Sequence, residues 1–203
     1  MQNLKELEEK IREGKEFNYI CFWGHREKTL GVADKSCFSQ WYPRGFTLDE
    51  VYYPTAEHYM MVEKARLFEP SRMEMVLNAK TTKEVKLLGR SIKNFDEKIW
   101  FEKSFDIVVK ANMAKFSQHQ DLKEFLFSTG DKVIVEASLY DKIWGIGMLG
   151  GDKRALNPLE WNGLNKLGFV LMLIREKLLE SEEEMSKSIY ATIANNCIVK
   201  GNI

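Results

Sequence analysis

Residues 140–152 read YDKIWGIGMLGGD. Within this stretch, Gly145, Gly147 and Gly150 have the spacing G-x-G-x-x-G, which occurs in loops that bind dinucleotides. In doubly wound α/β folds such a loop follows a strand directly and opens a helix whose N-terminus holds the pyrophosphate. The fold class of this chain therefore depends on whether a strand and a helix flank these glycines.

The flanking sequence lacks that context. The best strand pattern in the chain, VIVEA at residues 133–137, ends well before Gly145. The residues that follow Gly150 read GDKRALNP and reach Pro158 without an apolar helical stripe, and no series of alternating strands and helices surrounds the loop. We therefore reject the dinucleotide interpretation. The glycines more simply allow the backbone to turn tightly and to approach another surface.

Apolar periodicity over the rest of the chain is mostly helical. After Pro54, Thr55 can cap a helix, and the pattern then predicts mainly helices. The fold class that we expect is mainly α, a single helical domain with a small β component near the N-terminus. The predicted helices cover residues 3–13, 56–68, 71–78, 83–89, 95–116, 122–128 and 165–180, and the predicted strands cover 17–23, 37–41, 46–53 and 133–137.

Length and charge limit the possible functions. The 203 residues suffice for one domain with a sizeable core. The 30 Lys and Arg residues balance the 30 Asp and Glu residues, whereas proteins that grip a long nucleic-acid backbone usually carry a basic excess. The composition favours a small ligand, or one modified nucleotide, over a duplex.

The sequence also predicts a cytoplasmic location. Its N-terminal stretch, MQNLKELEEKIREGKEF, is charged and lacks the apolar core of a signal peptide. No apolar run approaches the roughly 18 residues that a membrane span requires. Cys21, Cys37 and Cys197 are odd in number and widely spaced, which is typical of reduced thiols and not of a disulfide framework.

Glu57 and Lys64 are the first candidates for chemistry. They lie on nearly the same face of the predicted helix 56–68, and that face also carries Met60 and Met61. A partly apolar surface should desolvate both charges and shift their pKa values. The spacing alone favours the simpler interpretation, in which Glu57 is an ordinary first-turn carboxylate that favours the helix dipole and Lys64 extends to water.

Asp141 and Trp144 are the second pair of candidates. They lie in the glycine loop after the best strand, and loops at strand ends often hold functional groups. A turn aspartate and a tryptophan that caps the core would produce the same pattern. His25, His58 and His119 are isolated in sequence, so we predict no metal site.

Separated carboxylates, aromatic rings and a few cations suit cleavage of a glycosidic bond. That reaction uses an acid or base, a carboxylate that stabilises an oxocarbenium-like centre, and a flat surface for a ring. Composition and spacing alone do not select this chemistry over simple binding.

Several segments together resemble the YbiA-like family, also called NADAR. The matching pieces include YPTAEHYMMVEKA, LGR, KIW, EASLYDKIWGIG and GLNKLGFVLMLIRE. They run in order from Phe22 to about Arg175. The combination of T-x-E-H-Y, an Asp-x-x-Trp-Gly loop and a terminal Asn-x-Leu-Gly helix is specific, whereas any one of these pieces alone would be weak.

The resemblance implies an N-glycosidase of mainly helical fold. Some proteins of this family hydrolyse early intermediates of riboflavin biosynthesis and release ribose 5-phosphate, and others remove ADP-ribose from modified guanine in nucleic acid. The implied substrate is thus a small ribosyl-phosphate or ADP-ribosyl compound, or a modified guanine in nucleic acid. No cofactor, metal or membrane partner is implied, and the oligomeric state is not predicted.

The resemblance also assigns residues. The family's catalytic acidic positions fall on Glu57 and Asp141, which we expect to face one cleft. The substrate-binding residues that it implies are Lys64, Arg90, Trp100, Trp144, Gly145 and Asn165. A module that binds ADP-ribose or a nucleotide without catalysis is the alternative, and a purely structural interaction domain is the third possibility.

The predicted domain boundaries follow the same segments. Residues 1–16 form an N-terminal helical extension, residues 17–180 form the YbiA-like domain, and residues 181–203 form a C-terminal extension. That extension opens with the acidic run SEEEM, and such runs are usually solvated.

Removing residues 184–203 should leave a folded and active protein, because no residue proposed for the chemistry lies there. Circular dichroism, thermal melting and turnover of the truncated chain would test this. A truncated chain that stays folded but has lost turnover would show that the extension contributes to the site.

Overall fold

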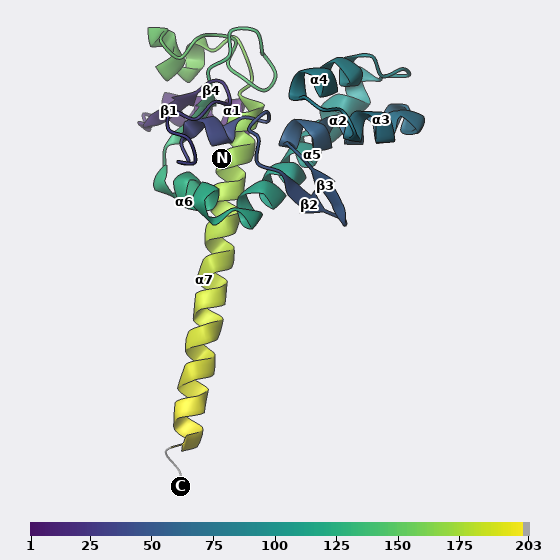
Figure 1. Ribbon diagram of the computed structural model, residues 1–203. Coiled ribbons are helices and arrows are strands. Elements are labelled where there is room, and N and C mark those ends of the chain that lie inside the picture. Colours follow the sequence, from purple (N-terminus) through teal and green to yellow (C-terminus); the bar gives the residue numbers. More distant parts are fainter. Residues whose placement is uncertain (201–203) are drawn as a thin grey trace.

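The computed structural model describes the backbone of residues 1–200 and the side chains of residues 1–188. Helices make up most of the regular structure, and two small sheets complete it (Figure 1). The elements, with 3₁₀ helices labelled η, are α1 (Leu4–Arg12), β1 (Tyr19–Phe22), η1 (Lys35–Phe38), β2 (Phe46–Leu48), β3 (Val51–Tyr53), α2 (Ala56–Phe68), η2 (Pro70–Arg72), α3 (Met73–Leu77), α4 (Thr82–Arg90), α5 (Glu97–Gln118), α6 (Gln120–Ser128), β4 (Val133–Glu136), η3 (Lys153–Leu156), η4 (Pro158–Glu160) and α7 (Lys166–Lys200).

Helix α2 has the bounds that the sequence predicts. The Thr55 hydroxyl accepts a hydrogen bond from the backbone N–H of His58 and thereby caps the helix. Most α2 side chains are buried, because α3, α4 and α5 pack around the helix. Its first turn is therefore rigidly placed, which matters because Glu57 lies in that turn.

The β structure joins two distant parts of the chain. Strands β1 and β4 pair in parallel, with Tyr19 opposite Val133 and Phe22 opposite Glu136. The expectation of a small β component near the N-terminus is thus only partly right, because half of this sheet comes from β4. The glycine loop after β4 leads to the short η3 and not to a long helix, as expected for a chain without a dinucleotide fold.

Two strand predictions need correction. Residues 46–53 form a hairpin and not one strand, because Asp49 and Glu50 both have positive φ and make a two-residue turn. Residues 37–41, predicted as a strand, begin inside the 3₁₀ helix η1. The Asp34 side chain caps η1 by accepting a hydrogen bond from the backbone N–H of Ser36. The backbone here therefore forms a local turn and does not pair with a neighbouring strand.

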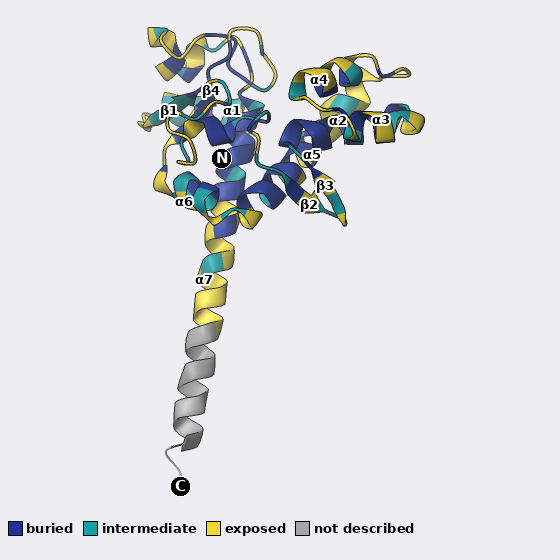
Figure 2. Ribbon diagram, in the orientation of Figure 1, coloured by how far each residue is buried: buried dark blue, intermediate teal, exposed yellow. Residues whose placement is uncertain are grey.

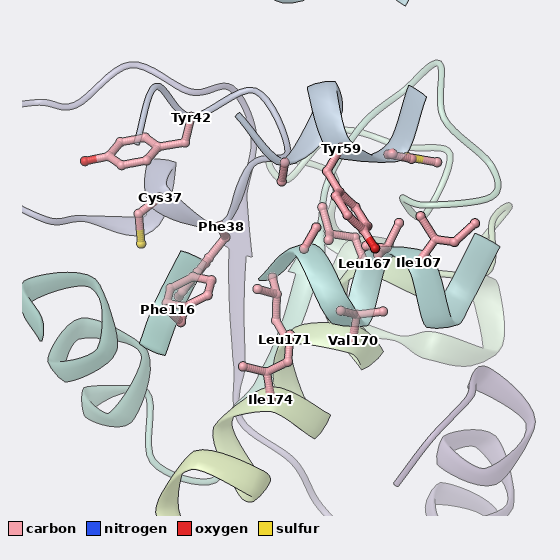
Figure 3. Packing of buried hydrophobic residues seen from close by; sticks show 14 of the residues in the cluster. Cys37, Phe38, Tyr42, Tyr59, Ile107, Phe116, Leu167, Val170, Leu171 and Ile174 are labelled. Carbon is pink, nitrogen blue, oxygen red and sulfur yellow. The ribbon is translucent and has the colours of Figure 1, made fainter. Parts of the chain in front are cut away.

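Helix α7 passes through the centre of the domain. Figure 3 shows Leu167, Val170, Leu171 and Ile174 of α7 in the same core as Ile107 and Phe116 of α5. Gly168 permits close contact with β4, because a Cβ at this position would lie 2.0 Å from the carbonyl oxygen of Ile134. The start of α7 is therefore fixed against the sheet.

The predicted end of this helix at residue 180 is wrong. Helix α7 continues to Lys200, and its stretch just beyond the domain is exposed (Figure 2). No Gly or Pro lies between Gly168 and Gly201, so the sequence offers no residue that would end the helix. The side chains of residues 189–203, Cys197 among them, lie outside the part that the structure describes.

The N-terminal helix α1 packs on the domain near η4, and its Leu7 is fully buried. Within the described residues, no helix combines the length and the apolar character needed to cross a membrane.

Lys115 of α5 is a charged residue inside the core. Its side chain is fully buried, and its Nζ donates to the carbonyl oxygens of Cys37, at 2.9 Å, and Ser39, at 3.3 Å. Burial lowers the pKa of this amine to about 8. Lys115 thus holds η1 and the following residues, which lead directly to Gln40 and Trp41.

Replacing Lys115 with Ala should lower the free energy of unfolding by about 2–5 kcal/mol, the range for truncating a long buried side chain, because it leaves a cavity and removes the Nζ donor from the Cys37 and Ser39 carbonyl groups, of which Ser39 keeps a hydrogen bond from the Tyr42 N–H. Lys110→Ala, on an exposed position of the same helix, is the matched control and should change it by less than about 0.5 kcal/mol. Urea unfolding of both variants measures the difference. Equal stabilities would contradict the role assigned to Lys115.

Candidate active site

A cavity of about 640 Å³ lies where five segments meet: the residues after η1, helix α2, helix α4, the end of β4 and the loop that follows β4. It contains five of the residues that the sequence singles out. These are Glu57, Lys64, Arg90, Asp141 and Trp144. Segments that are far apart in the sequence thus converge on one concave surface, the usual form of a ligand site.

Glu57 is enclosed in the wall of this cavity. Only 5% of the residue is exposed, and its backbone N–H donates to the carbonyl oxygen of Gln40 at 2.9 Å. Burial raises the pKa of its carboxyl group and nearby Asp141 raises it further, whereas Lys86, a hydrogen bond from Trp41 and Arg90 oppose the rise. The side chain is therefore a desolvated acid that faces cations.

Asp141 is held by the backbone of its own loop. Its Oδ1 accepts hydrogen bonds from the N–H groups of Ile143, at 3.0 Å, and Trp144, at 2.7 Å. The carbonyl oxygen of Asp141 also accepts a hydrogen bond from Gly147, which closes the loop. With one carboxylate oxygen committed to this turn, the carboxyl group has a fixed orientation and Oδ2 is the oxygen left for a ligand.

Four cations line the same cavity: Lys64, Lys86, Arg90 and the exposed Lys142. The Nζ of Lys64 lies 4.0 Å from the ring centre of Phe95 and 5.6 Å from that of Trp100. Burial and the neighbouring Arg90 lower the pKa of Lys64. Trp100 is not among the lining residues, so its contact with the site runs through Lys64.

Gly145 and Asn165 also lie outside the lining, and both hold Glu136. A Cβ at Gly145 would come within 2.8 Å of the Glu136 carbonyl oxygen. Asn165 is fully buried; its Oδ1 accepts from the backbone N–H of Glu136 and its Nδ2 donates to the carbonyl oxygen of Ile134, each at 2.9 Å. The φ of Asn165 is +52°, a conformation that asparagine tolerates better than most residues.

The start of α7 fixes the loop as well. The backbone N–H groups of Asn165, Lys166 and Leu167 donate to the carbonyl oxygens of Gly145, Ile143 and Trp144. These N–H groups have no acceptor within the helix, since they lie at its N-terminal end. The loop that carries Asp141 and Trp144 therefore completes the hydrogen bonding of the helix.

Sequence reasoning missed several lining residues, and Trp41, Lys86 and Glu136 are the three of them that act on the chemistry proposed below. Lys86 could have been found, because it lies four positions before Arg90 and so shares its helix face. Glu136 could have been found as the single charged residue in the apolar strand 133–137, next to the loop that carries Asp141. Trp41 is the last residue of the segment 37–41 that was predicted as a strand, and nothing in its sequence context marks it.

Glu136 is the third carboxyl group of the cavity. Its Oε2 is buried and has no hydrogen-bond partner among the described residues. Burial, Asp141 and Glu57 raise the pKa of Glu136 to about 8, with Lys86 opposing the shift. In the part of the chain that the structure describes, no three His, Cys, Asp or Glu side chains are grouped closely enough to hold a metal ion.

Comparison with known proteins connects this cavity to a family. The sequence model of the NADAR domain matches residues 21–179. The chain is 41% identical over 165 residues to N-glycosidase R617 of Acanthamoeba polyphaga mimivirus, covering 78% of this chain and 95% of the relative. It is 30% identical over 143 residues to the riboflavin biosynthesis protein VVA0006 of Vibrio vulnificus, covering 70% of this chain and 35% of that longer protein.

A solved structure has a similar fold. The NMR structure of the E. coli protein YbiA superposes with a TM-score of 0.66 at 26% sequence identity, and the match covers 84% of this chain and 90% of YbiA. The similarity thus extends over most of the helical domain.

Asn165→Ala should lower the free energy of unfolding by at least about 2 kcal/mol, because two buried backbone groups of β4 would each lose a partner, at about 1–3 kcal/mol apiece. Asn162→Ala, at an exposed position three residues earlier, is the control and should leave stability within about 0.5 kcal/mol. Thermal and urea unfolding test both variants. A stable Asn165→Ala protein would show that Asn165 does not hold the strand.

Proposed function

The chain belongs to the NADAR domain family, and on this premise we propose that it is an N-glycosidase, a hydrolase that cleaves the bond between a ribose and a nucleobase-like ring. The observation that carries the proposal is the cavity itself, in which Glu57 and Asp141 lie with four cations and the ring of Trp144. Relatives named as N-glycosidases support the activity.

Cleavage of an N-glycosidic bond places opposite charges on the two fragments. Positive charge develops on the sugar and negative charge on the departing ring. Glu57 is enclosed, so as a carboxylate it would act on the sugar cation through a low local dielectric. Asp141 is less buried and has a fixed orientation, which suits a base that receives a proton from the attacking water.

The cations suit the phosphate of the substrate. Lys64, Lys86 and Arg90 approach the cavity from α2 and α4, and Arg90 can offer two parallel N–H donors to phosphate oxygens. The rings of Trp41 and Trp144 line the same space and could stack on a flat heterocycle. The cavity volume lies within the range of sites for nucleotide-sized ligands.

Two substrate classes fit these features. One is an early intermediate of riboflavin biosynthesis, a class supported by the resemblance to a riboflavin biosynthesis protein. The other is ADP-ribose on guanine, where the balanced charge of the chain favours one modified base over a long duplex. Hydrolysis of both compounds side by side, with the released sugar identified by mass, selects between them.

A site for binding alone is the alternative function. It would use the cations and aromatic rings but would not need two carboxyl groups. Catalysis and binding can be separated by a substitution that removes one carboxylate and keeps its shape.

Glu57→Gln should reduce kcat by at least about 100-fold while the affinity for the sugar product stays near that of the wild type, because it removes charge that acts mainly in the transition state. Turnover assays and calorimetric binding of ribose 5-phosphate and ADP-ribose measure the two effects.

Glu63→Gln is the matched control, since Glu63 lies on the same helix outside this cavity and pairs with Arg66. Its kcat should equal that of the wild type. Full turnover by Glu57→Gln would remove Glu57 from the mechanism. A wild-type chain that binds either sugar phosphate but hydrolyses neither substrate would favour the binding module.

A further inference from the structure

Glu136 is the one carboxyl group lining this cavity to which the proposed reaction assigns no step. Its side chain lines the cavity together with Glu57 and Asp141. The departing ring needs a proton, and neither an enclosed carboxylate beside cations nor a base that takes a proton from water is suited to supply it. A third carboxyl group with different surroundings could meet this requirement.

The surroundings of the two glutamates differ in the groups that favour the charged form. Burial raises the pKa of both carboxyl groups and Lys86 opposes both rises, but Arg90 and a hydrogen bond from the Trp41 side chain oppose the rise at Glu57 alone. Glu136 has an enclosed Oε2 without a donor, and of the charged groups that act on it Asp141 and Glu57 are acidic and only Lys86 is basic. Of three neighbouring carboxyl groups, the one with the fewest donors keeps its proton.

The backbone of Glu136 is fixed at both ends. Its N–H donates to Asn165, and its carbonyl oxygen accepts from Ile146, at 2.9 Å, and Ser138, at 3.0 Å. Gly145 permits the close approach of the loop to that carbonyl oxygen. Two of the residues that the family resemblance singles out therefore position Glu136 and need not touch the substrate.

We propose that Glu136 is the general acid of this site, holding a proton on its carboxyl group and delivering it to the nitrogen of the departing ring. The inference rests on the proposed N-glycosidase function. As the bond from the anomeric carbon to nitrogen breaks, its electron pair passes to the nitrogen, which takes the proton from Glu136. Water adds to the anomeric carbon and gives a proton to Asp141, and that proton returns to Glu136 through solvent, so one water is consumed.

The protonation of Glu136 sets the pH dependence of the reaction. The pKa of Glu136 lies at about 8, above the ordinary value for a glutamate, so the acid is protonated at neutral pH. Activity should therefore be present below about pH 8 and should fall as the pH rises through that value. Glu57, Asp141 and Lys86 are the charged groups that set this value.

Glu136→Gln tests the assignment, with Glu102→Gln on an exposed position of α5 as the control. On whichever substrate the wild type cleaves, Glu136→Gln should lower kcat at pH 7 by at least about 100-fold. Its residual rate should no longer fall near pH 8, whereas Glu102→Gln should keep the wild-type rate and profile. Binding of the sugar product should be unchanged in both variants.

Glu136→Asp provides a second variant that retains a titratable carboxyl group, so it should keep a weakened activity that still falls at alkaline pH. A Glu136→Gln protein with the wild-type rate, or with the same alkaline fall, would overturn the proposal. A second result would also overturn the proposal: Glu136→Gln fails to fold or to bind the sugar product, while Glu136→Asp keeps the full wild-type rate. Glu136 would then have a structural role and not a role in proton transfer. Failure of the wild type to cleave any N-glycoside would instead overturn the proposed function.

Discussion

The hydrogen bonding at the start of α7 is the constraint on which the fold and the site both depend. The first N–H groups of a helix need acceptors from outside it, and here the carbonyl groups of residues 143–145 provide them. In the same turn, the Asn165 side chain binds two backbone groups of β4. One helix end thus joins the core, the strand that carries Glu136 and the loop that carries Asp141.

The same arrangement explains how acidic side chains can be kept out of water. Burying a carboxyl group is unfavourable unless it is paired, hydrogen-bonded or protonated, and the three carboxyl groups of the cavity meet this requirement in different ways. Asp141 accepts two backbone hydrogen bonds, Glu57 has a raised pKa and faces cations, and Glu136 has a raised pKa and a buried Oε2 without a donor. Their surroundings make three similar groups chemically different, which suits a reaction that moves protons in opposite directions.

Local signals in the sequence predicted much of this structure. The bounds of α2 were correct because Thr55 provides a cap and Pro54 ends the preceding segment. The predicted end of α7 was wrong because the acidic run after residue 180 makes the sequence less apolar but contains no residue that stops a helix. The strand predicted at residues 37–41 was wrong. The apolar side chains of this segment suit a strand, but hydrogen bonds with Asp34 and Lys115 hold the backbone here in a turn. Glu136 was missed because its burial and its acidic neighbours arise only when distant segments meet.

The protonation of Glu136 is the central claim, and a carboxyl titration tests it most directly. Carbon-13 NMR of protein labelled at the glutamate side-chain carboxyl, recorded from pH 3 to 10 and assigned with the Glu136→Gln variant, follows this group without any substrate. The account predicts that the resonance lost in that variant titrates at about pH 8. A Glu136 resonance that titrates near 4.5, the ordinary value for a glutamate, would contradict it.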